Sequence, residues 1–147
     1  MYYVDGVIHI AAPRAVVWRL FADLDRWPRW NPTVVVMAPL RGAPWAPDFR
    51  FRQTVRVGGR RLSFKPRVLY TDPGNYVTWV GRGFGVTGVH SWYFEDEATG
   101  SRVTTIEEFK GLGVPLMRLV IKPADLRAMF QASLRALKQA AEAEGPG

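Results

Sequence analysis

His90 and Glu107 are the two side chains in this sequence best suited to acid–base chemistry. Each lies in a stretch typical of a β-strand, 88–97 for the histidine and 102–110 for the glutamate. A two-residue turn pairs them directly, whereas a four-residue turn places them diagonally, still within reach. In either register, an imidazole beside a carboxylate is a competent general base for an acidic proton of a polyketone or aromatic precursor. Tyr70 is the candidate donor to the resulting enolate or carbonyl oxygen.

The same pair has two simpler interpretations. In the first interpretation the pair is purely structural. A buried glutamate is energetically costly without a partner, so His90 and Glu107 are in the core only to pair with each other. In the other they orient a ligand without catalysis. The second histidine, His9, falls on the opposite phase of its strand and is predicted to lie at the surface. Two histidines facing opposite ways in a chain without cysteine predict no metal site, and we expect no other cofactor.

A sheet and a long helix are needed to position these side chains. Apolar residues recur at three- and four-residue spacings from 124 to 143, which predicts an amphipathic helix that needs a larger apolar surface to pack on. Two short helices are predicted at 14–23 and 24–30. Alternation between turn signals predicts seven strands, at 3–10, 33–40, 48–57, 60–71, 76–82, 88–97 and 102–110.

Composition restricts the class of protein. The chain has 147 residues, of which 48% are hydrophobic and 22% charged, as expected for one folded domain over residues 1–147. Cysteine is absent, which fits a reducing cytoplasm. We found no basic leader followed by an apolar run and no stretch apolar enough to span a membrane, so the sequence predicts a cytoplasmic protein.

Several motifs resemble the START-like superfamily, which includes polyketide cyclases and dehydratases. In the first half these are IHIAAP at 8–13 and WPRWNP at 27–32, and in the second half GVHSWYF at 88–94 and TTIEEFKG at 104–111. The resemblance implies an α+β helix-grip fold: a seven-stranded curved antiparallel sheet wrapped around a long C-terminal helix, with two short helices after the first strand. It also implies a hydrophobic ligand cavity between sheet and helix. It does not select an activity, because this scaffold serves cyclases, hydrolases, lipid and quinone carriers and co-chaperones.

The apolar phase of each strand predicts the residues that face the helix and line the cavity, since a one-residue slip would reverse every side chain. Most are apolar or aromatic, which suits a planar or lipid-like ligand. The glycine-rich segment 81–88 is expected to be a mobile loop at the cavity mouth. The predicted ligand-binding residues are Phe49, Phe51, Gln53, Phe64, Trp79, Trp92, Thr105, Phe109, Met129, Phe130 and Ser133.

A basic hairpin is predicted around Gly58 and Gly59, whose tolerance of positive φ suits a two-residue turn. This turn sets Arg56 opposite Arg61, Arg52 opposite Lys65 and Arg50 opposite Arg67 on the face away from the helix. Such like-charged pairs destabilise a sheet. The side chains either cover the solvent face or bind an anionic partner such as an acyl carrier protein, a membrane surface or RNA. Pro66 suggests a bulge in this strand. The basic residues are Arg50, Arg52, Arg56, Arg61, Lys65 and Arg67.

Three functions therefore remain open at this stage. The first is binding of a hydrophobic, aromatic or polyketide-like small molecule, extended to cyclisation or dehydration if His90 and Glu107 act as acid and base. The second is a non-catalytic lipid or quinone carrier that uses the same cavity. The third is an adaptor that acts through the basic hairpin 50–67 with a filled cavity.

Overall fold

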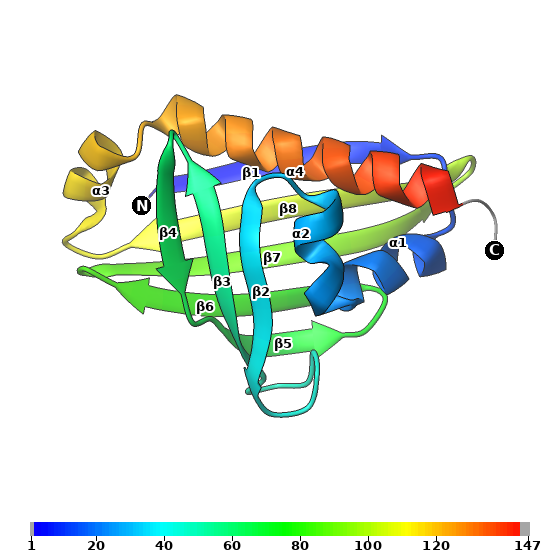
Figure 1. The fold of residues 1–147 in the computed structure, drawn as a ribbon, viewed down its shortest axis with the longest axis horizontal. Coiled ribbons are helices and arrows are strands. Elements are labelled where there is room, and N and C mark those ends of the chain that lie inside the picture. The colour runs from blue at the N-terminus through cyan, green and yellow to red at the C-terminus, as the bar shows by residue number, and fades with distance from the viewer. Residues whose placement is uncertain (1, 145–147) are drawn as a thin grey trace.

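One curved antiparallel sheet forms the body of the protein (Figure 1). The computed structural model describes residues 2–144. Within them the strands lie in the order β1-β8-β7-β6-β5-β3-β2, and β4 pairs with β3. The strands are β1 (Tyr2–Ile10), β2 (Val34–Arg41), β3 (Arg50–Val57), β4 (Arg60–Phe64), β5 (Arg67–Asp72), β6 (Tyr76–Gly83), β7 (Val86–Glu97) and β8 (Gly100–Lys110).

The helices lie where proline and the apolar periodicity predict them. Pro13 immediately precedes the first helix, and Pro123 begins the last one. Proline is tolerated there because the N–H groups of the first turn have no hydrogen-bond partner within the helix. The last helix lies along β1 in Figure 1. The helical segments are α1 (Arg14–Ala22), the 3₁₀ turn η1 (Leu24–Arg26), α2 (Trp27–Trp30), α3 (Val114–Val120) and α4 (Pro123–Glu144).

The predicted α+β architecture is confirmed, with one predicted strand divided. Residues 60–71 form β4 and β5, separated by Lys65 and Pro66, so the seven predicted strands become eight hydrogen-bonded segments of residues 2–144. Proline has no N–H to donate to a sheet, which explains the interruption. The predicted pairs Arg56–Arg61 and Arg50–Arg67 are present on either side of it.

A register shift in β5 corrects the predicted orientation of Tyr70. Val68 pairs with Trp79, but Tyr70 pairs with Thr78, so Leu69 is an extra residue without its own partner. Because alternate residues face opposite sides of a strand, this bulge moves Tyr70 away from the helix-facing side. Its side chain is 61% exposed, so the prediction that it faces the cavity was wrong.

Two other expectations about the sheet also fail. Phe64 pairs with Gln53, as the predicted register implies, but is 40% exposed, because α4 makes little contact with this hairpin. The start of α4 lies near the hairpin tip, where Gly58 lies against Asp125. The segment 81–88 is not a loop: β6 and β7 continue through it to a two-residue turn.

The core contains a dense aromatic cluster on the helix-facing side of the sheet. Phe21 of α1 contacts the rings of Trp27, Trp79 and Trp92, with centroids 5.0, 6.3 and 5.1 Å away. Trp45, from the loop after β2, inserts beside Phe51, Phe49 and Trp79. A second cluster, around Phe109 and the start of α4, fills the opposite end. Aromatic side chains therefore occupy most of the space between sheet and helix.

Candidate functional site

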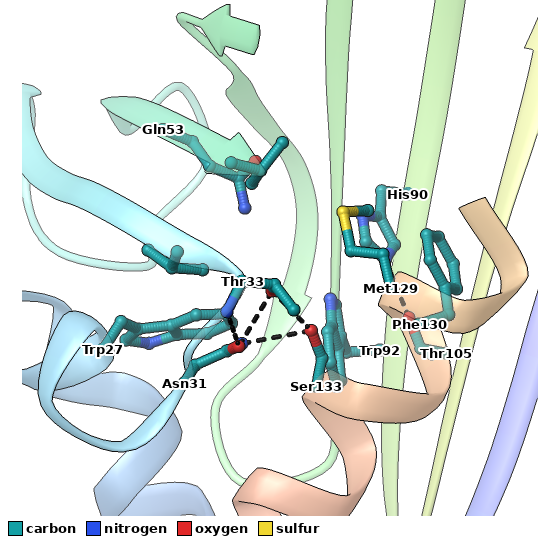
Figure 2. Close-up of a pocket in the computed structure, with 12 residues that line it drawn as sticks. Trp27, Asn31, Thr33, Gln53, His90, Trp92, Thr105, Met129, Phe130 and Ser133 are labelled. Atoms are coloured by element: carbon teal, nitrogen blue, oxygen red, sulfur yellow. Dashed lines mark hydrogen bonds between the residues drawn. The ribbon is translucent and has the colours of Figure 1, made fainter. Parts of the chain in front are cut away.

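A small cavity remains between α4 and the sheet, near β2 and β3. Its volume is about 30 Å³, room for one or two water molecules rather than a drug-sized ligand. Residues from six elements and from the segment that joins α2 to β2 meet there (Figure 2). The lining residues are Trp27, Asn31, Thr33, Val34, Gln53, Val55, His90, Trp92, Thr105, Met129, Phe130 and Ser133.

One wall of the cavity is a closed ring of hydrogen bonds (Figure 2). The Asn31 amide donates to Ser133 Oγ over 3.1 Å, and its carbonyl oxygen accepts from the hydroxyl and backbone N–H of Thr33, at 2.8 and 3.0 Å. The hydroxyls of Thr33 and Ser133 lie 3.0 Å apart. Because Thr33 donates to Asn31, Ser133 donates to Thr33, and both hydroxyl protons are used. The ring ties α4 to the segment before β2.

The indole N–H of Trp92 is the unused donor of this cavity. Trp92 is 3% exposed, and its nitrogen has no hydrogen-bond partner among the described residues. Figure 2 shows this nitrogen on the side of the ring toward Met129. A buried donor without a partner costs about 1–3 kcal/mol, so a hydrogen-bond acceptor placed in the cavity would be stabilised there.

His90 is held by stacking and by one hydrogen bond. Its ring stacks on Phe130 at 5.2 Å and on Trp92 at 5.5 Å. Nε2 lies 2.7 Å from Thr105 Oγ, within hydrogen-bond distance, whereas Nδ1 lies 3.6 Å from the Glu107 carboxyl, too far for a hydrogen bond. The direct cross-strand pairing of His90 with Glu107 selects the two-residue turn from the two alternatives that the sequence left open. Nε2 is therefore engaged with Thr105, whereas Nδ1 lies beside the Glu107 carboxyl without a hydrogen bond to it.

Burial keeps the histidine–glutamate pair uncharged at neutral pH. Loss of hydration lowers the pKa of His90 from 6.5 to about 3 and raises the pKa of Glu107 from 4.5 to about 8. The Glu107 side chain keeps 20% of its exposure, so water still reaches the carboxyl and moderates its shift. Glu107 is then a protonated acid and His90 a neutral imidazole, which reverses the carboxylate–histidine arrangement that a general base requires.

The structure brings together seven of the predicted site residues and disperses the others. Phe49, Phe51 and Trp79 are fully packed in the aromatic cluster rather than lining the cavity, and Phe109 lies in the second cluster. Glu107 contacts His90 but does not line the cavity. Tyr70 and Phe64 are exposed. The seven that line it are Gln53, His90, Trp92, Thr105, Met129, Phe130 and Ser133.

Sequence reasoning missed residues that lie outside regular strands. The missed residues Trp27, Asn31 and Thr33 lie within or just after the WPRWNP motif. The polar residues of this motif were the cue that could have placed this segment at the cavity. Trp45 fills the predicted cavity from a loop bounded by prolines, and its N–H donates to the Ala22 carbonyl over 2.8 Å. A large aromatic residue in a proline-rich loop is a cue that this loop packs inward.

Among residues 2–144, no three His, Asp or Glu side chains are grouped as they would be around a metal ion. In the same part of the chain, every helix is too short or too polar to cross a bilayer.

Comparison with solved structures shows the same fold in proteins of low identity. TTHA0849 from Thermus thermophilus is 19% identical, with 98% of this chain and 99% of that chain covered and a TM-score of 0.80. Major latex-like protein 151 of Panax ginseng is 13% identical, with 95% and 97% covered and a TM-score of 0.78. The di-domain ARO/CYC StfQ of the steffimycin biosynthetic pathway is 15% identical, with 97% and 51% covered and a TM-score of 0.74.

Sequence comparison identifies the family. No curated protein sequence matches the chain. The family described as "Polyketide cyclase / dehydrase and lipid transport" matches residues 1–142, nearly the whole length. The chain therefore belongs to this polyketide cyclase/dehydrase and lipid transport family.

Proposed function

We propose that this protein binds a small, largely apolar molecule that carries a hydrogen-bond acceptor, in the site beneath α4. The observation that carries the proposal is the buried, unpartnered N–H of Trp92 on the wall of a cavity whose surface is mostly apolar. A carbonyl or ether oxygen of a flat ligand would accept from this donor. The ring of Trp92 and the ring of Phe130 would then provide apolar contact.

Binding is favoured over proton abstraction by the state of His90. A general base works best when its pKa lies near the working pH, and burial lowers the pKa of His90 to about 3. Its Nε2 is engaged with Thr105, and its Nδ1 faces a carboxyl that is itself protonated at neutral pH. We assign His90 the role of an aromatic wall held in position by Thr105.

Ligand entry requires the site to expand from about 30 Å³ to the roughly 300 Å³ or more that small-molecule pockets occupy. The arrangement of α4 indicates where this occurs. The helix lies mainly along β1 and α1 and makes little contact with β3. Met129 lies on the lightly packed side and is only partly buried, and its unbranched side chain changes shape easily. We infer that the first turns of α4 move away from β3 to admit the ligand.

The family of the chain and two of its structural relatives support an aromatic, polyketide-like ligand. StfQ and BexL are both ARO/CYC proteins of biosynthetic pathways, although their likeness to this chain shows the fold alone. A carrier of lipids or quinones would use the same cavity residues. Both functions require apolar contact and an acceptor for the Trp92 N–H, so planar ligands that differ only in an acceptor test the binding that they share.

The test compares 9-fluorenone with fluorene, which lacks the carbonyl, by isothermal titration calorimetry. One hydrogen bond predicts that wild-type protein binds the ketone roughly threefold to tenfold more tightly. Trp92→Phe removes the donor and should abolish this preference. Trp79→Phe is the matched control: Trp79 is equally buried but absent from the cavity lining, so the preference should persist.

A second pair of variants tests the location of binding. Ser133→Leu fills the cavity and should weaken binding of both compounds, whereas Ala128→Leu adds the same bulk to the exposed side of α4 and should leave binding unchanged. Absence of binding of either compound by folded wild-type protein, or equal binding by Ser133→Leu, would refute the proposal.

A further inference from the structure

One end of the molecule exposes large apolar side chains that pack on nothing. Phe84, at the turn between β6 and β7, is fully exposed, and so is Leu112 in the segment between β8 and α3. Helix α3 buries none of its residues and exposes Leu116 and Leu119, at 65% and 80%. Figure 1 shows this turn and α3 at the same end of the sheet. Monomeric proteins rarely leave such apolar surface without a use.

The backbone at Phe84 makes this exposure more informative. Phe84 has φ of 52° and Gly85 has φ of 74°, so both central residues of the turn are left-handed, as in a type I′ hairpin. That turn favours asparagine followed by glycine, and a bulky side chain at positive φ is strained. Phenylalanine here therefore costs stability and gains no contact within the chain. Strain of this kind is typical of sites that serve a function.

Glycines hold the two apolar tips together. The N–H of Gly113 donates to the Gly85 carbonyl over 3.0 Å. A Cβ on Gly111 would lie 2.2 Å from that same carbonyl oxygen, and one on Gly113 would lie 2.2 Å from the Phe84 oxygen. Both segments thus approach closer than any other residue type would allow. Phe84 and Leu112 are presented as a fixed pair rather than as independent loops.

The charged residues of the two segments that carry these side chains are all positive. Residues 82–94 and 109–124 contain no aspartate or glutamate, and the nearest acid on β8 is Glu108. Four exposed cations accompany the apolar side chains, so the surface pairs protruding apolar groups with positive charge. That combination is complementary to an anionic bilayer, which takes apolar side chains at its interface and attracts nearby cations. The four cations are Arg82, Lys110, Arg118 and Lys122.

We propose that this end of the protein, comprising Phe84, Leu112, α3 and the four cations, docks on an anionic lipid bilayer. Phe84 and Leu112 enter the interface, and the cations contact the lipid headgroups. Protruding side chains on two narrow tips suit a fluid surface better than a flat protein partner. The surface is distinct from the basic hairpin 50–67 and from the cavity beneath α4, so its test is independent of ligand binding.

Co-sedimentation with vesicles tests the proposal. Wild-type protein should bind vesicles of phosphatidylcholine with about one third phosphatidylserine, bind pure phosphatidylcholine much less, and dissociate as salt rises. The double variant Phe84→Asn with Leu112→Asn should bind at least roughly tenfold more weakly. Phe84→Asn should not lower the urea midpoint, because asparagine suits the turn. Leu40→Asn, at an exposed leucine of β2, is the control and should bind like wild type.

A site-specific probe gives a second readout. The chain has no cysteine, so Phe84→Cys and Leu40→Cys can each carry one environment-sensitive dye. Emission should shift to the blue on anionic vesicles for the dye at position 84 and not for the dye at position 40.

Three results would overturn the proposal. The first is no binding of wild-type protein to anionic vesicles at low salt. The second is equal binding by the Phe84→Asn, Leu112→Asn variant, which would assign the membrane contact to another surface. The third is a lipid-free dimer in sedimentation analysis that the same double substitution dissociates, which would assign this surface to a second copy of the chain.

Discussion

Glu107→Gln should make the protein more stable at mildly alkaline pH, because it removes a carboxyl that folding keeps protonated. Burial raises the pKa of Glu107 from 4.5 to about 8. A group with a raised folded-state pKa contributes stability that is present below the unfolded pKa and lost as pH rises toward the folded one. The window is therefore pH 4.5 to 8. A shift of one pKa unit corresponds to about 1.36 kcal/mol. By pH 8 the free energy of unfolding of wild type therefore falls by up to roughly 4 kcal/mol relative to that of Glu107→Gln.

The measured difference should be smaller than this ceiling, because 20% of the Glu107 side chain is exposed and water moderates the shift. Urea unfolding of both proteins at about pH 5.5 and pH 8 provides the assay. The free energy of unfolding of the variant, relative to that of wild type, should rise by at least about 1 kcal/mol from about pH 5.5 to pH 8. The contribution of His90 is common to both proteins and cancels. Glu108→Gln, one residue along β8, controls for the loss of a carboxylate as such.

The reasoning would be refuted if wild type gained stability relative to Glu107→Gln as pH rose. That result would mean that Glu107 is ionised in the folded protein and paired with a charged His90. It would also restore the carboxylate–imidazole pair that general-base catalysis needs.

Three shorter predictions follow from the packing of other residues. Tyr70→Phe should leave the affinity for 9-fluorenone unchanged in calorimetry, because Tyr70 is 61% exposed on the side away from the helix. Trp45→Ala should lower the free energy of unfolding by about 3–5 kcal/mol, because it removes a 4% exposed ring from the aromatic cluster, and urea unfolding measures the loss. Arg61→Glu should raise the free energy of unfolding by about 0.2–1 kcal/mol in the same assay, because it converts the like-charged pair with Arg56 into an opposite-charged one.

The order and type of the elements could be read from the sequence because they depend on local patterns. Pro13 and Pro123 mark helix starts, and the apolar stripe of 124–143 predicted α4 to within one residue at each end. Register was predictable where a short turn determines it, as at Gly58 and Gly59. The pairing of His90 with Glu107 was one of two alternatives that the turn left open, and the structure selects it.

The errors occur where a local pattern is interrupted or where distant segments meet. A single extra residue at Leu69 turned Tyr70 to the other side of the sheet, and alternation alone gave no warning of it. Phe64 has the right orientation, but the helix that was expected to cover it lies along β1 instead. A prediction can therefore give the correct fold and still misplace residues of the site.

What the sequence by itself determined is the helix-grip architecture and the face on which His90 and Trp92 lie, since both follow from periodicity and turn chemistry. Only the tertiary structure decided how much space remains there. Phe21, from α1, and Trp45, from a loop, pack into the space that the strands were predicted to enclose as a cavity. Packing between segments distant in sequence depends on the shapes of many side chains at once, and no local pattern encodes it.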